Sequence, residues 1–272
     1  MNILITGCSK GFGLLFIEKL AQDGHKVYAT YRDRSNADAL FELAERHHNI
    51  HTVQLDVNEG AQIQAVRELI ERVDGRLNVL INNAGYGLMG ELTDLSPALW
   101  KEQFQTNVFA PAELTCQLIP LLNQAPEGGL VVNISSIASY LGLPAFGAYS
   151  ASKAALNTLS MSLAIEQSSN NLSVVVVEPG PFRTKFRDST VQAGEISNYQ
   201  KVRSKLFGTQ EDPETVAHLI GRLVEEKANG KATPLFREIP IGKGSNILRL
   251  ISRWLPQEWI VSLLAREMKR NF

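Results

Sequence analysis

The feature that most constrains the fold is an alternation of short apolar runs with longer amphipathic segments. Six segments place apolar residues at helical spacing: Gly13–Asp23, Ala37–Arg46, Ile63–Val73, Pro97–Leu122, Ala148–Gln167 and Pro213–Glu225. Seven short runs around them indicate strands: Asn2–Thr6, Val27–Thr30, Thr52–Leu55, Asn78–Ile81, Leu130–Ile134, Val174–Val177 and Pro234–Ile239. Strands that alternate with such helices form βαβ units around a parallel sheet. The pattern therefore predicts an α/β fold.

The composition excludes several classes of protein. The net charge of -1 provides no global field for nucleic acid, so we expect no nucleic-acid partner. Two cysteines, Cys8 and Cys116, make no disulfide framework and indicate free thiols in a reducing compartment. No apolar run reaches the roughly 18 residues of a spanning helix, and no signal-peptide pattern opens the chain. We expect a cytoplasmic protein without a metal site.

A glycine-rich turn follows the first predicted strand and precedes the first predicted helix. It is the segment Thr6–Gly13, with the sequence Thr-Gly-Cys-Ser-Lys-Gly-Phe-Gly. Glycines allow the backbone to approach a phosphate closely, and the following helix directs free N–H groups and a positive dipole end toward it. In this strand–turn–helix context the turn predicts a nucleotide-phosphate site.

The turn begins a series of motifs that resembles the classical short-chain dehydrogenase/reductase family. The further matches, in chain order, are Asn82–Gly85, Asn107, Ser136, Tyr149 and Lys153 in a Tyr-x-x-x-Lys pattern, Pro179-Gly180, and Thr184. The resemblance covers about residues 2–240. It implies a Rossmann-like doubly wound parallel sheet, with seven strands in the order 3-2-1-4-5-6-7 and helices on both faces. We expect one domain over residues 1–240, which includes a substrate loop at 185–210, and a helical extension at 241–272.

Tyr149 and Lys153 are four residues apart and therefore share one face of a helix. A nearby lysine cation lowers the pKa of a phenol and suits it to pass a proton to a carbonyl oxygen. The resemblance implies that Ser136 polarises the same oxygen and that Asn107 holds a water linking Lys153 to solvent. Ser135 is the alternative hydroxyl, and the family's spacing to the tyrosine selects Ser136.

The end of the second strand distinguishes NADP from NAD. An acidic residue there would bind the ribose 2′-hydroxyl, but Tyr31 occupies the position and Arg32 follows it. Arg32 and Lys10 can instead pair with a 2′-phosphate, so we predict NADP(H). The complete set of expected cofactor-binding residues is Gly7, Ser9, Lys10, Gly11, Phe12, Gly13, Arg32, Asp56, Val57, Asn83, Ala84, Gly85, Tyr149, Lys153, Pro179, Gly180, Phe182 and Thr184.

The expected substrate wall is mostly apolar or aromatic. Its candidates are Tyr86–Met89, Ile137–Phe146, Phe182, Phe186, Tyr199, Leu206 and Phe207. Such a wall indicates a small lipophilic carbonyl or alcohol substrate, and hence an NADPH-dependent aldehyde or ketone reductase. A retinoid- or steroid-type dehydrogenase and a non-catalytic NADPH-binding regulator are the alternatives. The family resemblance also implies a homodimer or homotetramer, and the sequence does not choose between these and a monomer.

The tail from Lys243 to Phe272 is basic and amphipathic. Its apolar residues fall at helical spacing, Pro256 divides it into two helices, and six basic residues face only Glu258 and Glu267. Such a tail can lie on a membrane surface, cap the substrate pocket or pack on a partner subunit. We favour packing on the chain itself or on a neighbouring subunit over membrane contact.

Overall fold

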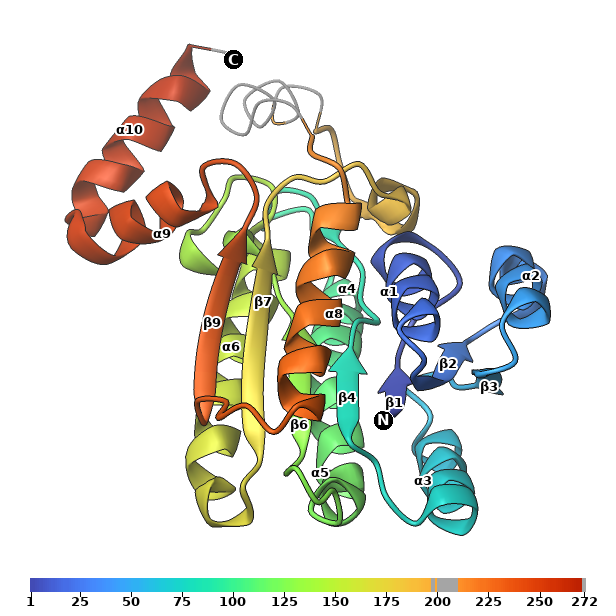
Figure 1. The fold of residues 1–272 in the computed structure, drawn as a ribbon. Helices are drawn as coiled ribbons and strands as arrows, with labels where there is room; N and C mark the ends of the chain where they lie inside the picture. Colours follow the sequence, from blue (N-terminus) through green and yellow to red (C-terminus); the bar gives the residue numbers. More distant parts are fainter. Residues whose placement is uncertain (197–198, 200–209, 271–272) are drawn as a thin grey trace.

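The protein is built on a central parallel sheet, as a computed structural model shows (Figure 1). The structure describes residues 1–196, 199 and 210–270. The sheet has the strand order β3-β2-β1-β4-β6-β7-β9, and every neighbouring pair is parallel. Its strands are β1 (Asn2–Ile5), β2 (Lys26–Tyr31), β3 (Ile50–Gln54), β4 (Val79–Asn82), β6 (Leu130–Ile134), β7 (Ser173–Pro179) and β9 (Phe236–Ile241). The predicted fold class and the order of the seven strands are confirmed.

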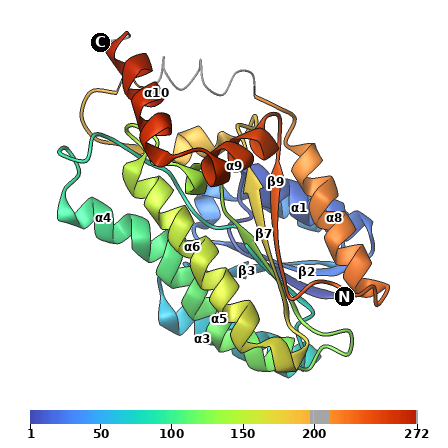
Figure 2. The ribbon, with the colours of Figure 1, turned by 90° about the vertical axis from the view of Figure 1, so that its left-hand side faces the viewer.

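Helices cover both faces of this sheet (Figures 1 and 2). One face carries α1 (Gly11–Gln22), α2 (Asp38–Arg46) and α8 (Glu214–Ala228). The other carries α3 (Gly60–Asp74), α5 (Ala110–Leu122) and α6 (Gly147–Glu166). Successive strand residues enter the two cores alternately: Ile3 and Ile5 of β1 lie in the first core and Leu4 in the second. Burial on both faces explains why these strands are continuous apolar runs.

The long helix predicted over Pro97–Leu122 is interrupted. It consists of α4 (Pro97–Phe104), a π-helical turn (Gln105–Phe109) and α5. Ser96 caps the start of the helix by accepting a hydrogen bond from Leu99 N. A single-turn π segment inside an α-helix marks many functional sites, and this one contains Asn107.

A further difference concerns the predicted substrate loop at 185–210. A small parallel sheet pairs β5 (Leu88–Met89) with β8 (Val191–Gln192), so the segment predicted as an irregular loop at 185–210 contains a strand. Leu206 and Phe207 lie outside the described residues. Two-residue strands carry too little periodicity to be predicted from sequence.

The tail folds into α9 (Ser245–Trp254) and α10 (Gln257–Lys269), which meet at Pro256. Both helices lie beyond the carboxyl ends of β7 and β9 (Figures 1 and 2). Among residues 1–196, 199 and 210–270, no helix is both long enough and apolar enough to cross a membrane.

Candidate active site

A cleft of about 1330 Å³ lies at the carboxyl ends of β1, β4, β6 and β7. Open α/β sheets bind their ligands at this edge, where the strand order reverses. The lining includes every predicted catalytic and cofactor-binding residue except two. Gly13 and Asn107 are the exceptions, and both are buried behind the lining. The structure therefore brings together side chains that are up to about 180 residues apart in sequence.

The glycine-rich turn packs closely against neighbouring backbone, which a side chain at Gly7 or Gly13 would obstruct. A Cβ at Gly13 would lie 2.3 Å from the carbonyl oxygen of Gly7, and Gly7 itself has a φ of +71°. Asn83, which directly follows β4, holds the glycine-rich turn in place: its Nδ2 donates to the carbonyls of Thr6 (2.9 Å) and Gly7 (3.0 Å). Helix α1 begins at Gly11 without a side-chain cap or an acidic residue in its first turn. Its free N–H groups therefore fit a phosphate.

Replacing Gly13 with alanine should weaken cofactor binding by at least about tenfold and destabilise the fold. The new Cβ would meet backbone, which cannot rotate away, so the turn itself must shift. Gly142→Ala is the matched control, because a Cβ at Gly142 meets nothing within 4 Å. Fluorescence titration with NADPH measures the affinity. Equal affinities for the two variants would show that the turn does not hold the cofactor.

Two cations line the cleft beyond the end of β2. Lys10 and Arg32 are exposed, and neither enters a salt bridge in the described part of the chain. The neighbouring carboxylate of Asp33, which also lines the cleft, accepts hydrogen bonds from Ser35 N (2.9 Å) and Asn36 Nδ2 (3.1 Å). These bonds, with the Ser35 contacts contributing most, lower the pKa of Asp33 and keep it ionised. This end of the cleft thus holds the cations Lys10 and Arg32 together with the carboxylates of Asp33 and Asp38, of which Asp38 pairs with Arg34.

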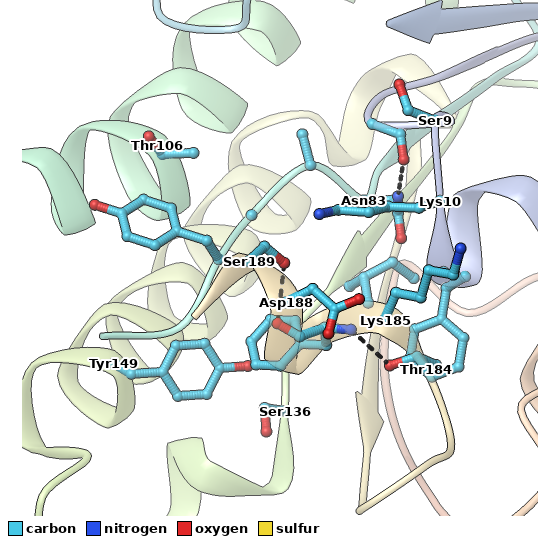
Figure 3. Close-up of a pocket in the computed structure, with 18 of the residues that line it drawn as sticks. Ser9, Lys10, Asn83, Thr106, Ser136, Tyr149, Thr184, Lys185, Asp188 and Ser189 are labelled. Atoms are coloured by element: carbon cyan, nitrogen blue, oxygen red, sulfur yellow. Dashed lines mark hydrogen bonds between the residues drawn. The ribbon is translucent and has the colours of Figure 1, made fainter. Parts of the chain in front are cut away.

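Tyr149 and Lys153 come from the first two turns of α6. The Tyr149 ring packs edge-on against Phe146, with ring centroids 5.9 Å apart, and lies 5.7 Å from the Phe186 centroid. Lys153 Nζ lies 5.9 Å from the Tyr149 ring centroid and donates a hydrogen bond to the carbonyl of Ile134 at 2.8 Å. Burial lowers the pKa of Lys153 to about 8. In Figure 3, Tyr149 and Ser136 lie toward one side of the cleft, and Ser9 and Lys10 toward the other.

Asn107 is held rigidly behind Lys153. Its Oδ1 accepts from Tyr86 N (3.2 Å), and its Nδ2 donates to the carbonyl of Tyr86 (3.0 Å) and to Ser152 Oγ (3.2 Å). A Cβ at Gly85 would lie 3.0 Å from Asn107 Oδ1 and 3.6 Å from Lys153 Nζ, so the three residues pack together. The asparagine therefore fixes the chain after β4 against α6.

The two neighbouring serines after β6 have different environments. The Ser135 hydroxyl is buried and donates to the carbonyl of Lys153 at 3.4 Å. Ser136 is half-buried, and its Oγ accepts from Ala138 N at 3.1 Å, which caps the short helical turn Ile137–Tyr140. Both line the cleft, but only Ser136 leaves its hydroxyl proton unused by these bonds. This geometry agrees with the choice of Ser136.

Glu178 is a buried residue next to the site, and the sequence analysis did not predict it. Its carboxylate accepts hydrogen bonds from the Tyr140 hydroxyl and from Asn157 Nδ2 (2.7 Å), and it lies 3.4 Å from Ser139 Oγ. Burial raises the pKa of Glu178. The contacts join β7 to the turn after Ser136 and to α6. In the sequence, the signal that could have indicated Glu178 is a single acidic residue directly after four consecutive valines.

Replacing Lys153 with methionine should abolish turnover and also stabilise the protein at neutral pH, by about 1–2 kcal/mol. The pKa of Lys153 falls from 10.5 to about 8 on folding, so the unfolded chain binds the proton more tightly. The free energy of unfolding of the native sequence therefore rises with pH between about 8 and 10.5. Over the same range, the difference in stability between Lys153→Met and the native sequence decreases. Urea denaturation across this range measures the difference. A less stable variant at pH 7 would contradict the argument.

The apolar wall is partly as predicted. Seven predicted residues line the cleft: Tyr86, Ile137, Ala138, Leu143, Phe146, Phe182 and Phe186. Leu88 and Met89 do not, because β5 turns both into apolar clusters beneath the wall. Tyr199 packs on the cluster that contains Tyr149, and Val191 lines the cleft without having been predicted.

Comparisons with known proteins agree with this geometry. The family model for short chain dehydrogenase matches residues 1–194. The uncharacterized oxidoreductase YusZ of Bacillus subtilis is 30% identical over 97% of both chains. Human retinol dehydrogenase 8 is 34% identical over 79% of this chain and 67% of its own.

Solved structures give the same result. A short-chain dehydrogenase from Streptomyces avermitilis has a TM-score of 0.78 and 31% identity, covering 98% of this chain and 94% of its own. The Pseudomonas aeruginosa RhlG/NADP complex has a TM-score of 0.75 and 27% identity, covering 89% and 95%. The chain belongs to the short chain dehydrogenase family and is an oxidoreductase that binds a nicotinamide cofactor.

Proposed function

We propose that the protein is an NADP(H)-dependent reductase of lipophilic aldehydes or ketones. One observation carries the proposal: a single cleft holds Tyr149 and Lys153 within an apolar wall at one side and the cations Lys10 and Arg32 at the other. The first pair suits proton transfer to a carbonyl oxygen, and the second suits a 2′-phosphate. The solved RhlG/NADP complex supports the choice of NADP.

The residues of the cleft divide the work of carbonyl reduction. When bound, the nicotinamide supplies a hydride to the carbonyl carbon. Tyr149 donates its hydroxyl proton to the carbonyl oxygen, and the Ser136 hydroxyl donates a hydrogen bond to the same oxygen. The Lys153 cation, 5.9 Å from the Tyr149 ring centroid, favours the phenolate that this transfer leaves on Tyr149, and Asn107 positions the backbone around that lysine.

The cofactor would lie along the strand ends. In this assignment the glycine-rich turn and α1 hold the pyrophosphate, Asp56 and Val57 lie at the adenine, and Asn83–Gly85 form the floor. Pro179 ends β7, and Gly180, Phe182 and Thr184 follow it; these four residues would lie at the nicotinamide end. Every residue predicted to bind the cofactor except Gly13 lines the cleft, which supports the assignment.

A retinoid- or steroid-type dehydrogenase is the second candidate. The observation that favours it is the aromatic wall, in which Phe146 and Phe186 both pack against Tyr149. Retinol dehydrogenase 8, at 34% identity, is a relative whose name gives such a substrate. Flat apolar substrates suit a wall of this kind.

Turnover of NADPH against a panel of aldehydes, ketones, steroids and retinal tests the proposal, with NADH in parallel. We expect NADPH oxidation on one lipophilic series and slower oxidation of NADH. Tight binding of NADPH with no turnover of any carbonyl would contradict the reductase and favour a non-catalytic regulator. Faster turnover with NADH would contradict the cofactor assignment.

A further inference from the structure

Helix α9 carries its polar face inward and its apolar face outward. Arg249 Nη2 and Arg253 Nη2 each donate to Glu238 Oε2 of β9 at 2.6 Å. At the start of the helix, the buried Ser245 hydroxyl donates to the carbonyl of Ile241 at 3.0 Å. Because these bonds tie the polar side of α9 to the edge strand of the sheet, the opposite side of the helix points away from the protein.

That opposite side is a stripe of large apolar side chains. Ile247 is 63% exposed, Leu250 57% and Trp254 80%, and with Ile251 they occupy one face at spacings of three and four residues. Helix α10 extends the surface with Trp259, which is 68% exposed. We call the exposed apolar set the tail face: Ile247, Leu250, Ile251, Trp254, Leu255, Trp259 and Leu263. An exposed apolar surface of this kind marks an interaction site, and the described residues of the chain leave these side chains exposed.

The charges around the tail face select its partner. The tail has six basic residues and two acidic ones, and Lys243, Arg266 and Lys269 enter no salt bridge among the described residues. In a symmetric contact between two copies, like charges around the same patch would meet and repel. An anionic surface would instead attract them. Exposed tryptophans with neighbouring cations are typical of helices that lie in a lipid interface.

We propose that α9 and α10 dock the protein on an anionic lipid surface, with the tail face in the interfacial layer. If the protein has the proposed function, docking in this orientation also places the substrate cleft near the lipid. Helix α9 packs against the turn Ile137–Tyr140, which begins the apolar wall of the cleft. Docking therefore holds the wall close to the lipid, where a lipophilic substrate would be concentrated.

Co-sedimentation with vesicles tests the docking without cofactor or substrate, so it is independent of the proposed function. We expect binding to vesicles that combine phosphatidylcholine with phosphatidylglycerol, weaker binding to phosphatidylcholine alone, and release by salt. The double variant Leu250→Glu, Trp254→Glu should reduce the binding by about tenfold or more. Val73→Glu is the matched control, because Val73 is a 53% exposed apolar residue on α3.

Each outcome decides between occupants of the tail face. Equal binding by the double variant and the control, or no binding to either vesicle, would overturn the proposal. Sedimentation velocity tests whether a second copy of the chain covers the tail face. If the native protein is a dimer that does not bind vesicles, and the double variant is a monomer, the tail face serves self-association and the proposal is wrong. Circular dichroism and NADPH affinity, unchanged in the double variant, show that it is folded.

Discussion

Replacing Tyr149 with phenylalanine should lower kcat by a factor of about 10² to 10⁴ and leave the affinity for NADPH nearly unchanged. The substitution removes one hydroxyl, while the ring keeps its packing against Phe146 and Phe186. Without the phenol, the carbonyl oxygen has no proton donor next to Lys153. Steady-state kinetics on the best substrate of the panel measures the loss, and fluorescence titration measures the cofactor affinity.

Tyr86→Phe provides the comparison for this variant. Tyr86 also lines the cleft, but burial and the charge of Glu102 raise the pKa of its hydroxyl, which makes it a poor proton donor. We expect its loss to change kcat by less than about tenfold. If Tyr149→Phe retained native turnover while Tyr86→Phe lost it, the proton donor would have to be reassigned.

The sheet and the glycine-rich turn could be predicted because their signals are local. Each strand is a continuous apolar run, since both of its faces are buried, and each turn carries its own glycines. The predicted seventh strand began two residues early, at Pro234, because a proline and the flanking apolar residues do not define where pairing starts. Boundaries depend on partner strands that the sequence does not reveal.

The rest of the site depends on contacts between distant segments. No periodicity distinguishes a π-turn from the α-helix around it, so Asn107 was known only through the family resemblance. Glu178 acquires its role from Tyr140 and Asn157, which lie on two other elements. The pairing of β5 with β8 joins segments about 100 residues apart and turns Leu88 and Met89 away from the cleft. Such long-range contacts are the part of a structure that local patterns cannot supply.

The residues at and after the end of β2 bear on the preference for NADP or NAD. The sequence places Tyr31 at the position where an acidic residue would bind a ribose hydroxyl, and Arg32 follows it directly. Asp33, the nearest acidic residue, follows Arg32. In the structure its two carboxylate oxygens accept hydrogen bonds from Ser35 N and Asn36 Nδ2.

Replacing Arg32 with alanine should therefore raise the KM for NADPH by about 10- to 100-fold and change the KM for NADH little. A hydrogen bond to a charged group contributes about 1.5–3 kcal/mol, which corresponds to that range. Removing Lys10 as well should enlarge the effect, since both cations flank the same end of the cleft. Kinetics with both cofactors, on the same substrate, measures the ratio.

Arg34→Ala is the matched control for Arg32→Ala. Arg34 is also exposed and two residues away, but its guanidinium pairs with Asp38 at 2.7 Å, lies 3.7 Å from the Phe41 ring centroid and does not line the cleft. The substitution Arg34→Ala should leave the preference between NADPH and NADH unchanged. An equal rise in both KM values for Arg32→Ala would mean that the arginine supports the fold of the adenosine end and not the 2′-phosphate. A loss of NADPH preference in Arg34→Ala would move the phosphate site two residues along the chain.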